Sequence, residues 1–397
     1  MSIRLLKRNK MLAKKAFFGL LSGLILCLSI NGLKAEVLKD EIGYSLRLET
    51  LASIDRGASY LLQSQLGNGS WNNHPAITSL VTVALANAPE RSAVDSGEAV
   101  DKALDYLKEQ VHDDGALWNS STEQYKLYST AIGALALVRC NRPGDLETIG
   151  KIRNYLVRSQ NTENSSDVKP VFFGGFAAGS GKRPTLTITQ WVVEALYLID
   201  SLRLPNDMTA SSYRRGTKQE MYVKAVDFIK RCQVRNDDKN NTKTSDIGYF
   251  RDSPKKLNDA AENNTSQRMP RSKAFLTCLG IKSLRYAGYS KGKPELNKAL
   301  AYLSENWNIS KNPGLEMKGY YTYLYALSKA LKSMNIPYIE TTDGAKHHWR
   351  GDIIRELLSR QKGDGAWRQT TPAWWENNPS LVTAYAVLTL EQCLPQK

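Results

Sequence analysis

Histidine and cysteine are scarce in this sequence, which disfavours several kinds of metal and redox site. The 397 residues include four histidines and five cysteines. No two cysteines form a Cys-x-x-Cys pair, so zinc knuckles and thioredoxin-like centres are disfavoured. We therefore expect neither a bound metal nor a cofactor. Most cysteines beyond the N-terminal segment are expected to be buried thiols, because a chain of this length can build its core without disulfides.

Acidic residues are missing from the first 35 positions, whereas seven of the chain's 54 lysines and arginines lie there. An apolar run from Ala16 to Ile30 follows most of these basic residues, and a small residue, Ala35, comes shortly after it. This order is typical of a secretory signal peptide. We expect residues 1–35 to be removed and the protein to be periplasmic or secreted. An uncleaved membrane anchor is the alternative, although the run is shorter than the roughly 20 residues of a spanning helix.

A clustered stripe of positive charge is also absent. None of the 39 acidic residues lies in residues 1–35, so loss of that segment lowers the formal net charge from +15 to +8. The remaining basic residues are scattered, with pairs such as Arg214-Arg215. Nucleic-acid binding needs a denser positive surface, so we expect no nucleic-acid partner.

Alternating strand patterns are absent as well, and helical repeats take their place. Apolar residues recur at helical spacing, as in Ile77, Leu80, Val81 and Ala84. Each repeat has a helix, a loop rich in Gly, Asn and Asp, and then a more apolar helix. The first helices of the repeats are predicted at roughly 52–65, 98–110, 148–160, 220–233, 295–306 and 351–361. The more apolar helices are predicted at roughly 75–87, 126–139, 186–200, 272–287, 319–332 and 379–393.

A helix that is apolar nearly all round must be buried on both sides. A ring of such helices inside a ring of amphipathic helices satisfies this condition. The sequence therefore predicts an all-α fold, an (α/α)6 toroid or closed double ring of about six helix hairpins. We expect residues 36–397 to form this single domain, with a polar surface insertion at about 236–271. An open superhelical solenoid of helix pairs is the structural alternative.

One loop motif recurs between the paired helices. In the first repeat Tyr60-Leu61 is followed by Gln65 and then by Gly69 and Trp71. The last repeat has Gln361, Gly365 and Trp367 at the same spacing. The glutamine can bond the loop backbone, the glycine permits a tight turn, and the tryptophan can pack back over the hairpin. These residues are therefore interpreted as structural.

The complete first copy and the strong last copy resemble the QW motif of squalene and oxidosqualene cyclases. The chain thus resembles the squalene-cyclase and prenyltransferase repeat family of α/α toroids across residues 52–393. The resemblance implies a central cavity for a long apolar molecule. Hydrophobic small molecules or lipids are accordingly the expected ligands, and an envelope protein is a second type of partner.

The catalytic motifs that the resemblance would imply are missing. The chain contains no Asp-x-Asp-Asp, the cyclase acid motif, and no Asp-x-Cys, which belongs to the prenyltransferase zinc site. At the corresponding helix starts threonine recurs, at Thr78, Thr130, Thr189 and Thr383. A hydroxyl group cannot protonate an alkene. The sequence therefore leaves open whether the protein is an enzyme.

Glu194 is the first candidate for chemistry, because it lies three residues after Trp191 on an apolar inner helix. A desolvated carboxyl group there would have a raised pKa suited to acid catalysis. The alternative is an ion pair with an arginine of a neighbouring helix. Asp343 and Glu376 are the other candidate catalytic residues. Asp343 lies in a polar loop that an Asp-Gly turn also explains.

Aromatic residues near the starts of two inner helices are candidates for ligand binding. Trp374 and Trp375 precede Glu376. We expect these three residues either to line the entrance of a ligand cavity or to pack the last hairpin against the first. The tyrosines between residues 320 and 325 are expected either to line the ring or to pack in the core. The candidate ligand-binding residues are Trp191, Tyr320, Tyr321, Tyr323, Tyr325, Trp374, Trp375 and Tyr385.

Three functions remain open at this stage. The first is a toroid that binds a hydrophobic, isoprenoid-like ligand, and it predicts an aromatic-lined central cavity. The second is a structural or protein-interaction toroid, which predicts a filled or polar centre. The third is an (α/α)6 carbohydrate-active enzyme, which predicts paired carboxylates beside an open cleft.

Overall fold

The computed structural model describes residues 42–87, 94–165, 168–178, 183–202, 204, 215–235, 248–254 and 272–395. Residues 48–394 form one compact unit. Its described part contains twelve α-helices and one two-stranded hairpin. The predicted signal peptide, residues 1–35, lies outside the described residues. Among the described helices, none combines the length and apolarity that crossing a membrane demands.

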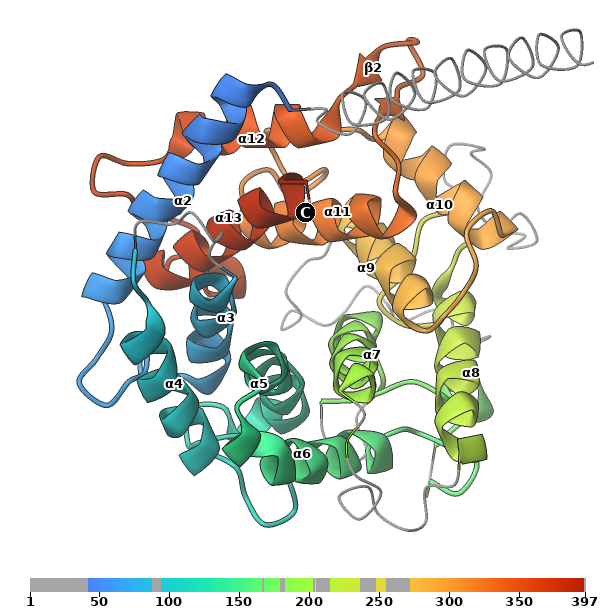
Figure 1. Ribbon diagram of the computed structural model, residues 1–397. Helices are drawn as coiled ribbons and strands as arrows, with labels where there is room; N and C mark the ends of the chain where they lie inside the picture. Colours follow the sequence, from blue (N-terminus) through green and yellow to red (C-terminus); the bar gives the residue numbers. More distant parts are fainter. Residues whose placement is uncertain are drawn as a thin grey trace, which may run out of the picture. The chain divides into compact units, whose positions relative to one another are not determined.

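Six helices form a closed inner ring (Figure 1). Each contacts the next in the order α3, α5, α7, α9, α11 and α13, and α13 contacts α3 again. This closure confirms the toroid and excludes the open solenoid. The inner helices are α3 (Pro75–Ala86), α5 (Lys126–Cys140), α7 (Leu186–Ser201), α9 (Lys273–Tyr286), α11 (Tyr320–Met334) and α13 (Pro379–Cys393).

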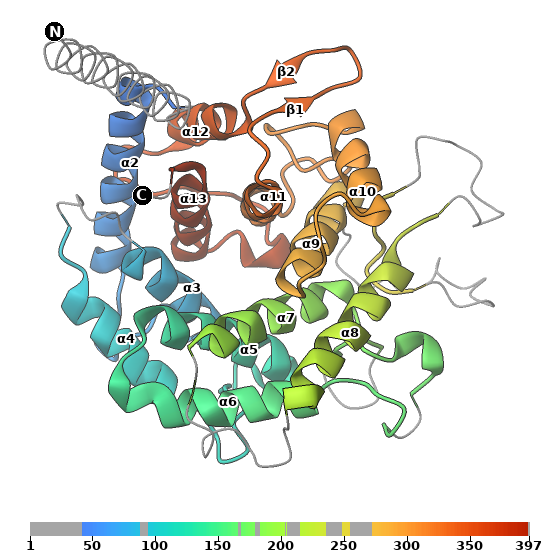
Figure 2. The ribbon, with the colours of Figure 1, turned by 45° about the vertical axis from the view of Figure 1, so that its right-hand side comes forward.

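Six further helices surround the inner ring, as both ribbon views show (Figures 1 and 2). They are amphipathic, and in α4 the buried residues are Val100, Ala103, Leu104, Tyr106 and Leu107. The outer helices are α2 (Tyr44–Gln63), α4 (Gly97–Glu109), α6 (Leu146–Arg158), α8 (Arg215–Cys232), α10 (Pro294–Glu305) and α12 (Trp349–Arg360). All twelve predicted helices are thus present, with bounds shifted by at most two residues except at the starts of α2 and α8, which lie eight and five residues earlier than predicted.

The starts of the inner helices follow local capping chemistry. His74, Thr185, Ser272 and Asn378 each accept a hydrogen bond at the side chain from the backbone N–H three residues on. Such caps satisfy one of the amide groups that a helix N-terminus leaves without a partner. Proline occupies the first turn of α3 and α13. Pro184 precedes Thr185, the cap of α7.

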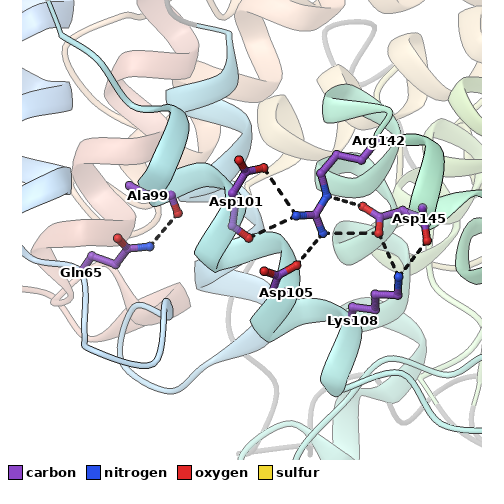
Figure 3. Close-up of polar contacts among 8 residues, drawn as sticks. Gln65, Ala99, Asp101, Asp105, Lys108, Arg142 and Asp145 are labelled. Atoms are coloured by element: carbon purple, nitrogen blue, oxygen red, sulfur yellow. Dashed lines mark hydrogen bonds and ion pairs between the residues drawn. The ribbon is translucent and has the colours of Figure 1, made fainter.

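A glutamine at the end of four outer helices joins each hairpin to the next one. In each case Nε2 donates to the carbonyl of the loop glycine and to a carbonyl of the next outer helix. Figure 3 shows the second contact for Gln65, which reaches Ala99 of α4 over 2.8 Å. The four residues are Gln65, Gln160, Gln233 and Gln361.

The loop glycines permit this close approach. Gly365 has φ +86°, and a Cβ there would lie 2.3 Å from the backbone oxygen of Arg56 on α2. Gly69 has the same relation to Lys102 on α4. Larger side chains are therefore excluded on two grounds, the left-handed backbone and the neighbouring carbonyl.

The aromatic residue that follows is held by a threonine of the inner helix. The backbone N–H of Trp71 donates to Thr78 Oγ1 over 3.0 Å, and that of Trp367 donates to Thr383 Oγ1 over 3.1 Å. The indole N–H of Trp71 donates to the Leu61 carbonyl over 2.9 Å. The recurring threonines therefore hold the loops, and both tryptophans are fully buried.

The outer ring gains an ion-pair cluster where α6 begins (Figure 3). Asp145, in the 3-10 turn Pro143–Asp145, is 1% exposed. Arg142 bonds it and also reaches Asp101 and Asp105 on α4, while Lys108 pairs with Asp145. Because a buried carboxylate is costly without partners, this cluster ties α4 to the start of α6.

The second and fifth hairpins depart from the pattern. The Gln110 amide at the end of α4 bonds its own helix at Tyr106, and the Asn306 amide at the end of α10 bonds its own helix at Tyr302. A two-stranded hairpin, β1 (Ile339–Glu340) and β2 (Lys346–His347), precedes α12. The missing glutamine link at α10 coincides with this added hairpin.

The predicted insertion at 236–271 is described in part. Residues 236–247 and 255–271 lie outside the described residues. Residues 248–254 form the loop of the fourth hairpin, where Phe250 is fully buried and its backbone N–H donates to Thr277. This part of the predicted insertion is therefore a degenerate copy of the loop motif, Gly248-Tyr249-Phe250. The four described cysteines are free, and three of them are buried.

Replacement of Gln361 by methionine tests the ring closure. Gln361 donates to the carbonyls of Ser53 and Gly365 and accepts from Arg56. Methionine keeps the side-chain length but leaves these groups without partners, so the free energy of unfolding should fall by about 2–4 kcal/mol. Denaturant unfolding measures this change. Gln110→Met is the matched control, because the Gln110 amide bonds only the carbonyl of Tyr106 on its own helix. Equal losses in both variants would contradict a special role for Gln361.

Candidate functional site

A cavity of about 800 Å³ lies at the N-terminal ends of the inner helices. Residues of the first turns contribute to its wall, among them Thr187 of α7, Lys273 of α9 and Thr322 of α11. The loops before α5 and α13 complete the wall with Tyr125 and Trp375. The ring therefore provides a hollow on the side where these helices begin.

Aromatic rings form much of this wall. Trp375 meets Tyr125 edge-on at 5.7 Å between ring centroids. Tyr128 meets Trp191 edge-on at 6.2 Å, and Tyr325 lies 5.7 Å from Tyr385. All six residues line the cavity. These contacts fix the rings against one another and present apolar faces to the hollow.

Two tryptophans are held at the cavity by an unusual backbone. Trp374 and Trp375 both have φ +57°, a left-handed conformation that bulky residues rarely adopt. Trp374 packs on Gly319, where a Cβ would lie 2.6 Å from its ring. Such strain persists only when its surroundings enforce it, and it concentrates at functional sites. The loop is therefore built to keep both indoles in the cavity wall.

The structure brings five of the predicted ligand-binding residues together and separates three. Trp191, Tyr325, Trp374, Trp375 and Tyr385 line the cavity.

Tyr320, Tyr321 and Tyr323 are buried away from the cavity. The hydroxyl groups of Tyr320 and Tyr323 donate to the carbonyls of Ile309 and Asn308 in the loop before α11. Tyr320 and Tyr323, three residues apart, share the face of α11 that packs against this loop, which agrees with the core-packing alternative. Tyr321 is buried as well and is not among the residues that line the cavity.

Glu194 lies in a buried ion cluster below the aromatic wall. Lys282 of α9 pairs with one carboxylate oxygen at 2.8 Å, and Lys329 of α11 pairs with the other. Lys329 also donates to the hydroxyl of Tyr325 over 3.2 Å. One carboxylate thus serves two ammonium groups at the centre of the ring.

This cluster decides the charge of Glu194. Burial favours the neutral acid, but Lys282 and Lys329 outweigh it and lower the pKa of Glu194 to about 2. The expected raised pKa is therefore replaced by a lowered one, and an ionised carboxylate cannot donate a proton. The alternative, an ion pair, is what the structure contains, with lysines in place of the expected arginine. Burial lowers the pKa of Lys282 to about 8, whereas Glu194 raises the pKa of Lys329.

Glu376 is fully buried and caps helix α11 from the adjacent loop. Its Oε1 accepts from the backbone N–H and the hydroxyl of Thr322, each over 2.8 Å. Its Oε2 has no hydrogen-bond partner among the described residues. Burial raises the pKa of Glu376 to about 7, although the bonds to Thr322 oppose this. Glu376 does not line the cavity itself, but it bonds Thr322, which does. These bonds hold the loop that carries Trp374 and Trp375 against the start of α11.

Asp343 lies in the turn of the β1–β2 hairpin, away from the cavity. Its carboxylate accepts from the Thr341 hydroxyl over 2.6 Å and from the backbone N–H of Ala345 over 3.2 Å. These bonds lower its pKa and account for the residue as a turn former. The Asp-Gly interpretation agrees with this geometry.

Two polar cavity residues were missed in the sequence. Gln190 is 1% exposed and precedes Trp191 on α7, and Lys282 is 1% exposed on α9. Both line the cavity. A polar residue on an otherwise apolar inner helix indicates a possible site residue. This criterion selects Gln190 and Lys282 as well as Glu194.

The remaining charged groups of the described wall lie near the loops. Asp252 accepts from the backbone N–H and the hydroxyl of Thr187. Arg183 donates to the hydroxyl of Ser253 over 2.7 Å. Asp252 is the one carboxylate among the described residues that line the cavity. Paired carboxylates of the kind that glycoside hydrolysis requires are therefore not found in this part of the wall.

Comparisons with known proteins show where this architecture occurs. The type II terpene cyclase MstE from Scytonema, in a complex with geranylgeranyl dihydroxybenzoate, matches with a TM-score of 0.53 and 14% sequence identity. The match covers 88% of this chain and 99% of that one. A protein from Actinoplanes matches with a TM-score of 0.50 and 16% identity, over 87% and 99% of the two chains. The fold is therefore that of the terpenoid cyclases. No family model matches the sequence, and no curated protein does.

The raised pKa of Glu376 predicts a pH-dependent stability. The carboxyl group titrates near pH 4.5 when unfolded and near 7 when folded, so its stabilising contribution is complete below pH 4.5 and is lost as pH rises through 7. Glu376→Gln keeps the acceptor for Thr322 and stays neutral. Relative to the wild type, its free energy of unfolding should therefore rise by about 2–3 kcal/mol between pH 4.5 and 8.

Unfolding curves recorded across this pH range give the difference between variant and wild type. The contribution of Glu391, whose pKa burial also raises, cancels in that difference. Asp343→Asn, in the exposed turn, is the control and should show no such rise. A difference for Glu376→Gln that stays constant with pH would refute the raised pKa.

Proposed function

We propose that this protein binds an apolar, isoprenoid-like ligand in the cavity at the centre of its toroid. The observation that carries the proposal is the aromatic-lined hollow of about 800 Å³ at the N-terminal ends of the inner helices. Its volume lies within the roughly 300–1,000 Å³ of small-molecule sites in proteins. An extended unsaturated chain is a suitable occupant, because it can contact several ring faces along its length.

The terpene cyclase comparison supports the same ligand class. MstE is described with a geranylgeranyl-bearing substrate, and a further structure holds the product merosterolic acid A. This chain has the same double-ring fold, and the aromatic residues of its cavity wall lie at one end of the ring. We therefore propose a ligand with an isoprenoid chain.

Binding is favoured over cyclisation started by protonation of an alkene. Such a step needs a strong acid against the substrate. In the described part of the cavity wall Asp252 is engaged by Thr187. Glu194 is ionised, and Glu376, with a pKa of about 7, is too weak an acid for an alkene. The geometry thus supports a carrier or binding role for the scaffold.

A protein-interaction toroid is the second candidate, and one observation favours it. The ion cluster of Glu194, Lys282 and Lys329 fills the ring beneath the cavity with polar groups. Charged groups at the centre are compatible with a scaffold that no longer binds a small molecule there. In that case the protein would recognise an envelope protein instead. The third candidate, a carbohydrate-active enzyme, lacks this kind of support.

We further propose that the protein acts outside the cytoplasm. The basic segment and apolar run in residues 1–35 support export by a signal peptide. The intact mass of the mature chain tests this directly, because cleavage after Ala35 removes those residues. A mass that includes them would favour the anchor.

Titration with geranylgeraniol, a neutral isoprenoid alcohol, tests ligand binding. Trp191, Trp374 and Trp375 line the cavity, so a bound chain should change tryptophan fluorescence in a saturable manner. Trp375→Leu removes a large contact surface and should weaken binding by about tenfold. Trp118→Leu is the control, because Trp118 stacks on His112 at 4.2 Å, away from the cavity. A wild-type protein without saturable binding would overturn the proposal, as would equal losses in the two variants.

A further inference from the structure

The ion cluster beneath the aromatic wall carries an excess of positive charge. Its side chains are almost completely buried, with exposed fractions of 1% for Glu194, 1% for Lys282 and 11% for Lys329. Two ammonium groups share one carboxylate, so the three groups together retain one positive charge when both lysines are protonated. A buried charge without full compensation is costly. The cluster therefore favours a further negative charge beside it.

Lys282 is the member of the cluster that faces the cavity. It lines the hollow, and its Nζ lies 2.8 Å from Glu194 Oε2 and 4.8 Å from the centroid of a Trp191 ring. Lys329 is occupied by the other carboxylate oxygen and by the Tyr325 hydroxyl. An ammonium group has three N–H donors, and Glu194 engages one face of Lys282. The remaining donors of Lys282 are directed away from Glu194.

Gln190 adds a second polar group at the same place. It lies one helical turn before Glu194, so both project from the same face of α7. Gln190 is 1% exposed and lines the cavity, and its Oε1 has no hydrogen-bond partner among the described residues. A buried amide oxygen without a partner costs free energy, and a carboxylate, which only accepts, would have to meet the N–H side of the amide and not Oε1. Because a carboxamide can turn by half a rotation, it can present its N–H to an acceptor.

We propose that Lys282 and Gln190 form a subsite at the floor of the cavity for a carboxylate at the end of the ligand's isoprenoid chain. The inference rests on the proposed function and deepens it, because it assigns the ligand's polar end and its orientation. The carboxylate enters first and accepts from Lys282 and Gln190. The apolar chain then lies along Trp191, Tyr325 and Trp375 toward the mouth.

A carboxylate fits this subsite better than a phosphate or diphosphate. The cluster has one surplus positive charge, and a carboxylate carries one negative charge. A diphosphate carries a larger charge and would need more donors. Loss of the proton from Lys282 is the other route to neutrality, and the lowered pKa of about 8 shows how near that route lies. At pH 7 Lys282 remains charged, so an anion can still bind there.

The cavity mouth is the competing place for an anion. Arg183, Arg251 and Lys273 belong to the wall near the loops, and Asp252 lies among them. A carboxylate bound there would leave the floor unused and would point the chain inward. Binding at the floor requires Lys282, whereas binding at the mouth requires Lys273. Variants of these two lysines therefore distinguish the two orientations.

Paired titrations with geranylgeranoic acid and geranylgeraniol at pH 7 test the subsite. The two probes share one isoprenoid chain and differ in the end group. The wild-type protein should bind the acid at least about tenfold more tightly than the alcohol, because bonds to charged groups are stronger. Lys282→Met should bring this ratio close to one, chiefly by weakening the binding of the acid.

Two independent variants and a control keep the test decisive even if one variant does not fold. Lys282→Met leaves a one-to-one pair between Glu194 and Lys329, so the buried cluster becomes neutral. Gln190→Met leaves all three charges in place and should lower the ratio by roughly threefold, in line with one neutral hydrogen bond. It gives the same comparison if Lys282→Met does not fold. Lys273→Met is the matched control at the mouth and should keep most of the preference.

Three results would overturn the subsite. Equal binding of acid and alcohol by the wild type would show that no anion is recognised. Loss of the preference in Lys273→Met, with retention in Lys282→Met, would place the anion at the mouth. An unchanged ratio in both Lys282→Met and Gln190→Met would exclude the floor. Failure of the wild type to bind either probe would instead refute the proposed function itself.

Discussion

The toroid depends on one repeated hydrogen-bond pattern, in which a glutamine at the end of an outer helix donates to two carbonyls at once. One carbonyl belongs to its own loop and the other to the next outer helix, as Gln65 does with Gly69 and Ala99. The pattern sets the spacing between neighbouring hairpins, and Gln361 uses it to join the last hairpin to Ser53 of the first. At four of the six joints, the closing one included, the glutamine satisfies a loop carbonyl and a carbonyl of the next outer helix, and it thereby helps the chain of helix pairs to close into a ring.

Ring closure also decides where a ligand can bind. The inner helices begin on one side of the ring, and the aromatic residues of their first turns and preceding loops surround a hollow there. Toward their other ends the helices are joined by Glu194, Lys282 and Lys329, which fill the centre with charge. The same architecture thus produces an apolar wall and a cationic floor in one cavity. We propose that an amphiphilic molecule binds there, with its apolar chain against the wall and its acidic end at the floor.

Much of the fold could be predicted from the sequence, because its signals are local or periodic. Helical spacing located all twelve helices, and the Gln65–Gly69–Trp71 spacing identified a loop whose contacts are as expected. The site was harder to predict, because it depends on which helix faces which. Glu194 was singled out as a possible acid, but its lysine partners are 88 and 135 residues away along the chain, and no local pattern ties them to it. The sequence left open whether Tyr320, Tyr321 and Tyr323 line the cavity or pack in the core, since an apolar helix gives little indication of which of its faces meets the cavity.

The most direct test of the central claim is native mass spectrometry of the mature protein purified from its own host without denaturant, followed by solvent extraction. The account predicts a complex heavier than the polypeptide by one small molecule, and an extract that contains an isoprenoid-like lipid with a carboxylate. A ligand-free protein that emerges bound to another polypeptide would contradict the account and would favour an interaction scaffold.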